Sequence, residues 1–263
     1  MFLQMFLQKK LCLHTHFSVK RPIFAAEMDF RKLYYSLADL LLPRMCNGCG
    51  CRLALGEELV CTKCMLTMPV EHKHDWRYNR HANDWAGHEG LAGVGAYTRY
   101  THDGIAAHII HNLKYYRHTA LGPWMGRLAA QQLRATGLFD GAQAIVPLPL
   151  APQRHRRRGF NQSELIAQGM AEVLQLPIVT TLLRRTGAFE SQTHFSYAQR
   201  LENAREAFSL NPDVHPDEYA GRHFILVDDV MTTGATMLSA ISAIEQIPDA
   251  RFTAFCWAWV YKS

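Results

Sequence analysis

The sequence predicts an α/β protein with a parallel sheet flanked by helices, preceded by a small cysteine-rich module. Two features lead to this fold class. From residue 91 onward, short apolar segments alternate with amphipathic segments long enough for helices, a pattern typical of parallel sheets. Upstream, five of the seven cysteines fall between residues 46 and 64. The 263 residues, 48% of them hydrophobic, are enough for one large core and one small module.

The N-terminal region divides at a change in composition. Residues 1–27 mix apolar side chains with Gln, Lys and His, without the apolar core and cleavage site of a signal peptide. We expect them to be a disordered extension, or to precede a true start at Met28. Residues 28–69 form the next unit. Apolar residues at helical spacing over 29–42 predict a helix that Pro43 ends, and the cysteine module follows.

The main domain is expected over 91–263, after a linker of residues 70–90 that is rich in His, Asn, Asp and Gly. Its elements follow from hydrophobic periodicity and turn residues. The strands are predicted at 91–97, 144–147, 177–183, 207–210, 224–227 and 252–260, and the helices at 104–115, 123–135, 162–174 and 236–246. Residues 184–206 lack such a pattern, and unpatterned connections of that length are usually functional.

Composition narrows the function classes only in part. The net charge of +5 permits an anionic partner, such as nucleic acid or a phosphorylated substrate, without requiring one. No apolar run approaches the ~18 residues needed to span a bilayer. An odd number of clustered cysteines suits a metal site in a reducing compartment, so a cytoplasmic protein is expected.

A small-hydroxyl loop follows the predicted strand 224–227. Asp228 and Asp229 end that strand, and Thr232-Thr-Gly-Ala-Thr236 opens the next helix. Free amides and the dipole at a helix N-terminus favour phosphate, and the threonine hydroxyls add donors. Two carboxylates beside a phosphate need other partners, and ribose hydroxyls with Mg²⁺ are the natural ones. The string therefore predicts a sugar-phosphate site.

A plain helix cap is the alternative for this string, because Asp and Thr commonly cap helices. Other phosphate-binding signatures are missing from the sequence, which contains neither Gly-x-x-x-x-Gly-Lys-Ser/Thr nor a Gly-x-Gly-x-x-Gly after a strand. Nucleotide hydrolases and dinucleotide oxidoreductases are therefore disfavoured.

An arginine-rich segment separates strand 144–147 from helix 162–174. It is expected to be a loop, and it carries Arg154, Arg156, Arg157 and Arg158. Asn161, with Glu164 three residues later, predicts the cap of the following helix. Clustered arginines repel one another unless they meet an anion, and a diphosphate suits the guanidinium fork. A solvated basic loop and a contact with nucleic-acid phosphates are the alternatives.

The cysteine cluster has the spacing of a zinc ribbon. Cys46-x-x-Cys49 and Cys61-x-x-Cys64 are two pairs, each expected on a tight turn, and four thiolates close a structural tetrahedral site. Cys51 could replace Cys49 or remain a free thiol. A closed site has no open coordination position, so the zinc is expected to be structural.

The Asp228–Thr236 string resembles the phosphoribosyl-diphosphate motif of type I phosphoribosyltransferases. That resemblance implies that Asp228 and Asp229 hold the ribose hydroxyls and that 232–236 bind the 5-phosphate. The loop after the first core strand binds pyrophosphate in that fold. The residues implied at the site are Asp228, Asp229, Thr232, Thr233, Gly234, Ala235, Thr236, Arg156, Arg158 and Gly159, with Lys114 as a further source of positive charge.

With Arg158-Gly-Phe-Asn-Gln162 and the cysteine pairs, the chain resembles the ComF family of late-competence and DNA-utilisation proteins over roughly residues 46–260. Leu113-Lys-Tyr115 agrees with this resemblance, as do Gln192, Arg200, Asn203 and Phe208. The stretch 184–206 would then be a hood that closes over substrate and excludes water.

Two functions follow from the resemblance. The first is an enzyme that transfers the phosphoribosyl group from phosphoribosyl diphosphate, with Mg²⁺, to a nitrogen nucleophile. The second is a protein without turnover that senses phosphoribosyl diphosphate or a nucleotide, and binds single-stranded DNA or proteins of the competence machinery.

Overall fold

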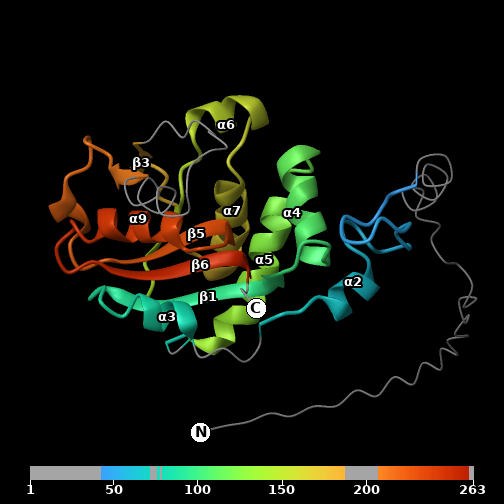
Figure 1. Cartoon of the computed structure of the whole chain (residues 1–263), viewed down its shortest axis with the longest axis horizontal. Helices are drawn as coiled ribbons and strands as arrows, with labels where there is room; N and C mark the ends of the chain where they lie inside the picture. The colour runs from blue at the N-terminus through green and yellow to red at the C-terminus, as the bar shows by residue number, and fades with distance from the viewer. Residues whose placement is uncertain (1–42, 72–75, 78, 187–206, 261–263) are drawn as a thin grey trace, which may run out of the picture. The chain divides into compact units, whose positions relative to one another are not determined.

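A four-stranded parallel sheet organises the protein in the computed structural model, which describes residues 43–71, 76, 77, 79–186 and 207–260. The strand order is β1-β6-β5-β2 (Figure 1). These strands are β1 (Leu91–Tyr100), β2 (Ala144–Pro147), β5 (His223–Met231) and β6 (Arg251–Val260). Every neighbouring pair is parallel, which confirms the predicted fold class.

Helices connect the parallel strands, as parallel pairing requires. They are α4 (Ile105–Tyr115), α5 (Leu121–Leu133), α7 (Gln162–Leu174) and α9 (Ala235–Ile244), with the shorter α6 (Pro152–Arg158) and the 3₁₀ turns η1 (Arg134–Thr136) and η2 (Pro216–Tyr219). The short helices α2 (Thr62–Thr67) and α3 (Arg80–Asp84) precede β1.

The predicted strand 177–183 is reduced to a single bridge between Ile178 and Ile145. The strand it would pair with, β2, is only four residues long and ends at Pro147, so little backbone is available for a longer ladder. The chain instead forms β3 (Leu183–Arg185), which pairs antiparallel with β4 (Phe208–Leu210) in a separate two-stranded sheet.

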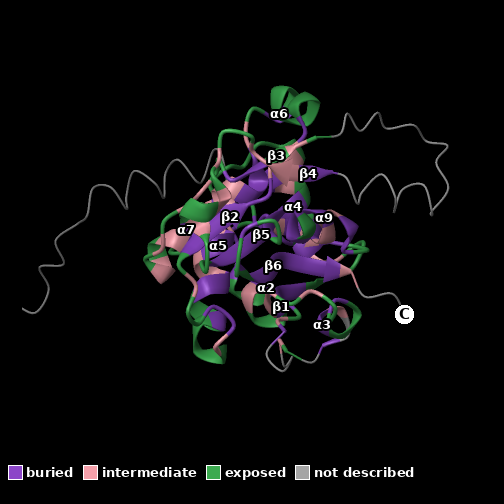
Figure 2. Cartoon of the chain, turned by 90° about the vertical axis from the view of Figure 1, so that its left-hand side faces the viewer, coloured by how far each residue is buried: buried purple, intermediate pink, exposed green. Residues whose placement is uncertain are grey.

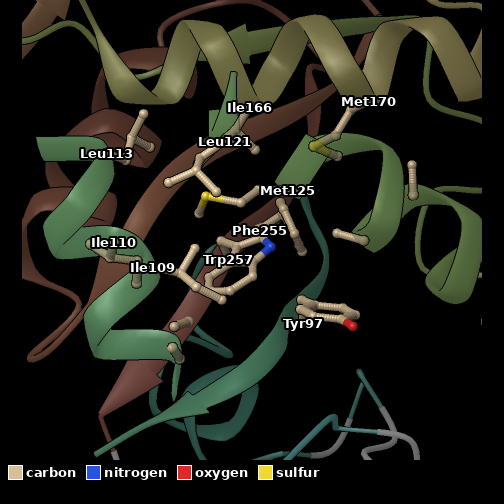
Figure 3. Close-up of a cluster of buried hydrophobic side chains, with 14 of the residues drawn as sticks. Tyr97, Ile109, Ile110, Leu113, Leu121, Met125, Ile166, Met170, Phe255 and Trp257 are labelled. Atoms are coloured by element: carbon tan, nitrogen blue, oxygen red, sulfur yellow. The ribbon is translucent and has the colours of Figure 1, made fainter. Parts of the chain in front are cut away.

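The sheet is buried on both faces because its side chains alternate. Ile225 and Val227 of β5 belong to one core cluster, and Phe224 and Leu226 belong to the other. Helices α4, α5 and α7 supply the first cluster around the fully buried Trp257 (Figure 3). Helix α9 supplies much of the second. Figure 2 shows the strands as buried between exposed outer surfaces.

Helices α5 and α7 pack with their backbones almost in contact. A Cβ added at Gly126 would lie 1.9 Å from the carbonyl oxygen of Ile166, and one added at Gly169 would lie 1.9 Å from that of Pro123. Only glycine permits this approach. The contact holds α7 against the sheet, so that its N-terminus stands at the carboxyl end of β5, where Ser163 reaches Asp228.

Several predicted segments lie outside the described residues. They are the extension 1–27, the helix 29–42 and most of the long connection, with Gln192, Arg200 and Asn203. The predicted linker 70–90 carries α3, and its Ala82 and Trp85 are buried in the second core cluster. No helix within the described ranges is long and apolar enough to cross a bilayer.

The arginine-rich segment is a helix, so its prediction as a loop was wrong. Pro152 occupies the first turn of α6, where its missing N–H costs nothing, and Gly159 ends the helix with φ 83°. Arginine is itself a good helix former, which the emphasis on its charge overlooked. Much of α6 is exposed in Figure 2.

We predict that Gly169→Ala lowers the free energy of unfolding by about 2–4 kcal/mol, because a methyl group would collide with backbone that cannot rotate away. Chemical denaturation followed by circular dichroism measures the change. Gly87→Ala is the matched control, since nothing lies within 4 Å of its added Cβ, and it should be nearly neutral. Equal stability of both variants would contradict the proposed packing constraint.

Candidate functional site

The carboxylates of Asp228 and Asp229 lie where β5 extends beyond the end of its neighbour, β2. β2 ends at Pro147, paired with Val227, whereas β5 continues to Met231 on its β6 side. The N–H of Leu148 donates the last bond, to the carbonyl of Val227 at 2.9 Å. Asp228 and Asp229 therefore lie just past the end of β2, at the carboxyl edge where ligands of open α/β sheets bind.

Asp229 pairs with a lysine from α4. The Lys114 ammonium lies 2.9 Å from Oδ1 and 2.8 Å from Oδ2 of Asp229, so it bridges both oxygens. The lysine side chain is 20% exposed and the carboxylate 10%. A pair with this little exposure is poorly screened by solvent. Lys114 is thus committed to Asp229 in the ligand-free protein.

Asp228 has no cation as a direct partner among the interactions of the described residues. Its Oδ1 accepts from the N–H of Asp229 at 2.8 Å and from the Ser163 hydroxyl at 3.2 Å. Burial and the charge of Asp229 raise the pKa of Asp228 to about 7, although Lys114 and these two hydrogen bonds oppose the rise. The ionised form is therefore poorly compensated.

The loop that follows β5 presents its hydroxyls outward. Thr232 and Thr233 are exposed, and Gly234 begins α9 with φ 77°. The Thr233 hydroxyl accepts from the N–H of Ala235 at 3.4 Å. Thr236 is half-buried on the first turn of α9. The helix N-terminus therefore stands directly beyond the two carboxylates.

Trp85 supports this loop from beneath. A Cβ added at Gly234 would lie 2.4 Å from Cζ2 of Trp85, which is itself buried. Sequence reasoning missed this residue because it lies in a segment with the composition of a linker. No local motif marks it, and only the fold brings it to the loop.

The arginines of α6 have different environments. Arg156 and Arg157 are exposed, while Arg158 is 9% exposed and its guanidinium lies 5.4 Å from the centre of the Tyr115 ring. The Nε of Arg158 is buried and has no hydrogen-bond partner within the described part of the chain. A buried guanidinium donor of this kind is suited to an anion. Gly159 closes the helix beside it.

Arg185 is a further residue that the sequence did not indicate. Burial lowers its pKa, as does the charge of Arg154, while the charge of Asp228 raises it. The Arg185 guanidinium therefore interacts electrostatically with both Arg154 of α6 and Asp228. Arg185 lies at the start of an unpatterned stretch, where nothing in the sequence separates it from Arg184. Ser163 was also missed, although it follows the Arg158–Gln162 string directly.

Asn161 caps α7 as predicted, but Glu164 accepts a hydrogen bond from the Asn161 side chain and not from its backbone N–H. The Asn161 side chain accepts from the N–H of Ser163 at 3.1 Å and donates to Glu164 Oε1 at 3.1 Å and to the carbonyl of Leu148 at 3.0 Å. The Glu164 carboxylate therefore bonds the Asn161 amide group. These contacts join the start of α7 to the end of β2.

Four thiols come together in the N-terminal module. The Sγ atoms of Cys46, Cys49, Cys61 and Cys64 all lie within 4.8 Å of one another, close enough to hold one metal ion. Backbone N–H groups of Gly48 and Cys61 point at the Cys46 sulfur, at 3.3 and 3.2 Å. Such donors stabilise a thiolate.

The two cysteine pairs differ in backbone. Cys46 and Cys49 lie on a tight turn, in which the Gly50 N–H donates to the carbonyl of Cys46 at 2.9 Å. The second pair lies in the first turn of α2, with Cys61 as its N-cap, so the prediction of a second tight turn was wrong. Both arrangements expose backbone N–H groups to sulfur.

Cys51 lies outside the group of four, with its Sγ 3.2 Å from that of Cys49. A hydrogen bond from the backbone of Cys51 lowers the pKa of the Cys49 thiol. Hydrogen bonding to Cys49 and Cys61 raises the pKa of Cys51 to about 12. Cys49 is therefore the better thiolate ligand.

The site predicted from sequence is thus partly assembled by direct contact. Asp228, Asp229 and Lys114 form one charged group, and the loop 232–236 follows it along the chain. Arg158 and Gly159 lie at the end of α6. Arg185 interacts electrostatically with both Arg154 of α6 and Asp228.

Comparison with known proteins agrees with this architecture. A family model described as a phosphoribosyl transferase domain matches residues 157–248. DNA utilization protein YhgH of Escherichia coli (strain K12) is 31% identical over 216 residues, which cover 75% of this chain and 89% of that protein. Competence protein F of Haemophilus influenzae is 36% identical over 110 residues, covering 42% of this chain and 47% of that protein.

Among solved structures, a crystal structure of adenine phosphoribosyltransferase aligns with 56% of this chain and 74% of its own, at a TM-score of 0.37 and 18% identity. The extent of the match to DNA utilization protein YhgH settles the family. The chain belongs to the ComF family, and its main domain has the type I phosphoribosyltransferase-like fold, joined to an N-terminal four-cysteine module.

Proposed function

We propose that the protein binds phosphoribosyl diphosphate together with Mg²⁺ and transfers the phosphoribosyl group to a nitrogen nucleophile. The observation that carries this proposal is the juxtaposition of Asp228 and Asp229 with the loop 232–236 at the N-terminus of α9, in which Thr232 and Thr233 are exposed. Acceptors of hydroxyl protons stand next to donors for a phosphate dianion. A 5-phosphorylated ribose presents the complementary groups in that order.

In this proposal each end of the ligand has its own residues. Asp228 and Asp229 accept from the ribose 2- and 3-hydroxyls. The 5-phosphate is bound by the hydroxyls and amides of Thr232, Thr233, Gly234, Ala235 and Thr236. Arg156, Arg158 and Gly159 take the pyrophosphate, for which the unpartnered Nε of Arg158 supports a buried contact.

The reaction would break the bond between the ribose anomeric carbon and the diphosphate oxygen, and the electron pair would leave with pyrophosphate. A bond from the nitrogen lone pair replaces it, and the nitrogen loses a proton. The anomeric carbon gains positive charge as the diphosphate gains negative charge. The chain would lower the barrier by holding both reactants in line and by stabilising the departing charge with arginine.

The residues fit a divalent cation at this end of the sheet. Asp228 is an incompletely compensated carboxylate, since its partners donate only to Oδ1 and its pKa is raised to about 7. Hard oxygen donors of this kind suit Mg²⁺, which is carried mainly by phosphates. When bound, it would neutralise charge on the diphosphate.

For the N-terminal module we propose a structural zinc ion held by Cys46, Cys49, Cys61 and Cys64. Four converging thiols are the donor set that Zn²⁺ prefers, and N–H groups already point at one of them. Such thiols persist in a reducing cytoplasm, which is the proposed location.

A second candidate function is binding without turnover, coupled to single-stranded DNA or competence proteins. The exposed arginines of α6 favour it, because they can contact phosphates of nucleic acid. The name of one relative, DNA utilization protein YhgH, also points to DNA. Pyrophosphate release separates the two functions, since only an enzyme produces it.

We predict that the protein releases pyrophosphate from phosphoribosyl diphosphate and Mg²⁺ in the presence of a suitable base from a panel, and that Asp229→Ala abolishes the release. Loss of a charge-assisted hydrogen bond should also weaken binding by about 10–100-fold. Calorimetric titration measures the affinity. Asp213→Ala, at an exposed turn, is the matched control. Tight binding without release by any base would leave the sensor function instead.

We predict that Asp228→Asn makes the free protein more stable at pH 8 yet unable to respond to phosphoribosyl diphosphate. With its pKa raised to about 7, Asp228 in the folded protein keeps its proton up to about that pH, whereas an unfolded aspartate loses it near pH ~3.9. Its contribution to stability is therefore complete below pH ~4 and is lost as pH rises through about 7.

Asparagine mimics the protonated carboxyl, so the variant should match the wild type near pH 4 and exceed it at pH 8, by roughly 2–4 °C in Tm. Thermal unfolding at both pH values, with and without the ligand, measures this. A variant that is less stable than the wild type at pH 8 would contradict the assigned strain at Asp228.

We predict one zinc ion per chain in freshly reduced protein, measured by elemental analysis. Cys49→Ser should reduce zinc content well below one and lower Tm, because it removes a ligand. Cys51→Ser is the matched control two residues away and should retain the metal. Loss of zinc in the Cys51 variant but not in the Cys49 variant would reverse the ligand assignment.

A further inference from the structure

The turn that carries the first cysteine pair rests on α4 and on the residues after it. We call residues 46–51 the knuckle. Asn47, a member of the knuckle, is only 6% exposed. Its N–H and its side-chain Nδ2 both donate to the carbonyl of Leu59, at 3.0 and 2.8 Å. Asn47 is therefore held rigidly inside the module.

Three side chains outside the module reach the knuckle. Nδ1 of His108 lies 2.8 Å from the carbonyl oxygen of Gly48, and Asn112 donates to the carbonyl of Asn47 at 3.0 Å. His118, beyond the end of α4, places its Nδ1 2.6 Å from Oδ1 of Asn47. Since that oxygen can only accept, His118 Nδ1 carries the proton and donates.

Arg117, the residue before His118, contacts the end of α6. Arg117 adopts φ 57°, a left-handed conformation that is unfavourable for a side chain of its size. Its Nε donates to the carbonyl of Arg158 at 3.2 Å, and its guanidinium lies 3.2 Å from a Cβ added at Gly159. Two consecutive residues thus make the contact with the end of α6 and the contact with the knuckle.

We propose that Asn47 and His118 are positioning residues, through which the cysteine knuckle holds Arg117 against the carbonyl of Arg158 and so sets the pyrophosphate end of the ligand site. This inference rests on the proposed function for the identity of the ligand. The contact of the knuckle with His118 and that of Arg117 with Arg158 do not depend on that identity.

Arg117 is strained in its left-handed conformation. A left-handed non-glycine residue persists only where its surroundings hold it. Backbone bonds close this turn, among them those from the N–H of Thr119 to the carbonyl of Arg117 at 2.8 Å and from the N–H of His118 to the carbonyl of Asn112 at 3.4 Å. Two side-chain bonds tie the turn to its surroundings: His118 to the knuckle, and Arg117 to the carbonyl of Arg158. Without the bond from His118 to the knuckle, the turn can shift, and the carbonyl of Arg158 loses its donor. The buried Arg158 guanidinium would then no longer be fixed over Tyr115.

The test compares His118→Phe, which keeps a ring but loses the donor, with His118→Asn, whose amide restores a donor close to Nδ1. Affinity is measured for three probes: phosphoribosyl diphosphate with Mg²⁺, inorganic pyrophosphate with Mg²⁺, and ribose 5-phosphate. His118→Phe should weaken the first two by about 10-fold, as expected for one lost buried hydrogen bond. Ribose 5-phosphate should change by less than about 3-fold, because its loop 232–236 is not attached to the knuckle.

His118→Asn should restore pyrophosphate affinity, and His102→Phe, at a 95% exposed histidine, should leave it unchanged. Equal weakening for all three probes, or no rescue by asparagine, would overturn the proposal and indicate general destabilisation. Zinc content of every variant should stay at the wild-type value.

Amide hydrogen exchange decides the coupling without any ligand. In His118→Phe, exchange should accelerate at residues 156–160, some 40 positions along the chain, where the Gly159 N–H donates to the carbonyl of His155 at 2.7 Å. Unchanged exchange there would overturn the positioning role even if the wild type binds every probe. A wild type that binds no probe would overturn the proposed function, while accelerated exchange would still establish the coupling of the knuckle to α6 through His118 and Arg117.

Discussion

The unequal length of two neighbouring strands is the constraint on which the site depends. β5 pairs with β6 along its whole length, but β2 stops at Pro147 and leaves the last residues of β5 without a partner on that side. The same strand that is buried on both faces thus emerges as an open edge. Its two carboxylates lie on a central strand of the sheet, and β2 does not cover them because it is short.

In the ligand-free site, the ionised form of Asp228 is electrostatically unfavourable. Two adjacent carboxylates share one lysine, which bridges Asp229, so Asp228 bears the cost of burial and repulsion and its pKa rises to about 7. Hydroxyl donors or a cation would relieve that cost, which links the strain to ligand binding. Perturbed carboxylates in such positions are typical of functional sites. The proposed reaction needs no further charged group from β5 itself, because positive charge comes from α6 and α4.

The N-terminal module is more than an appendage in this arrangement. A four-thiol site could hold a metal without taking any part in chemistry, yet its knuckle contacts three side chains of α4 and the following turn. α4 carries Lys114, and the turn carries Arg117. The partner of Asp229 and the partner of Arg158 thus lie on segments that contact the module, whereas the loop 232–236 makes no such contact within the described part of the chain.

Local sequence patterns determined much of this protein. The strand–Asp-Asp–Thr-Thr-Gly–helix string, the Asn161 cap and the cysteine spacing each act over a few residues, so the parallel fold, the family and the four thiols could be predicted from them. Tertiary structure decided what local patterns cannot contain. Trp85 lies in a stretch with the composition of a linker, and Arg185 lies in one without a pattern, because each reaches the site through folding alone. The arginine segment became a helix that begins at Pro152 and ends at Gly159, and the Arg158 guanidinium came to lie over the ring of Tyr115 from another helix. Long-range packing of this kind depends on which elements meet in space, and that is settled only when the whole chain has folded.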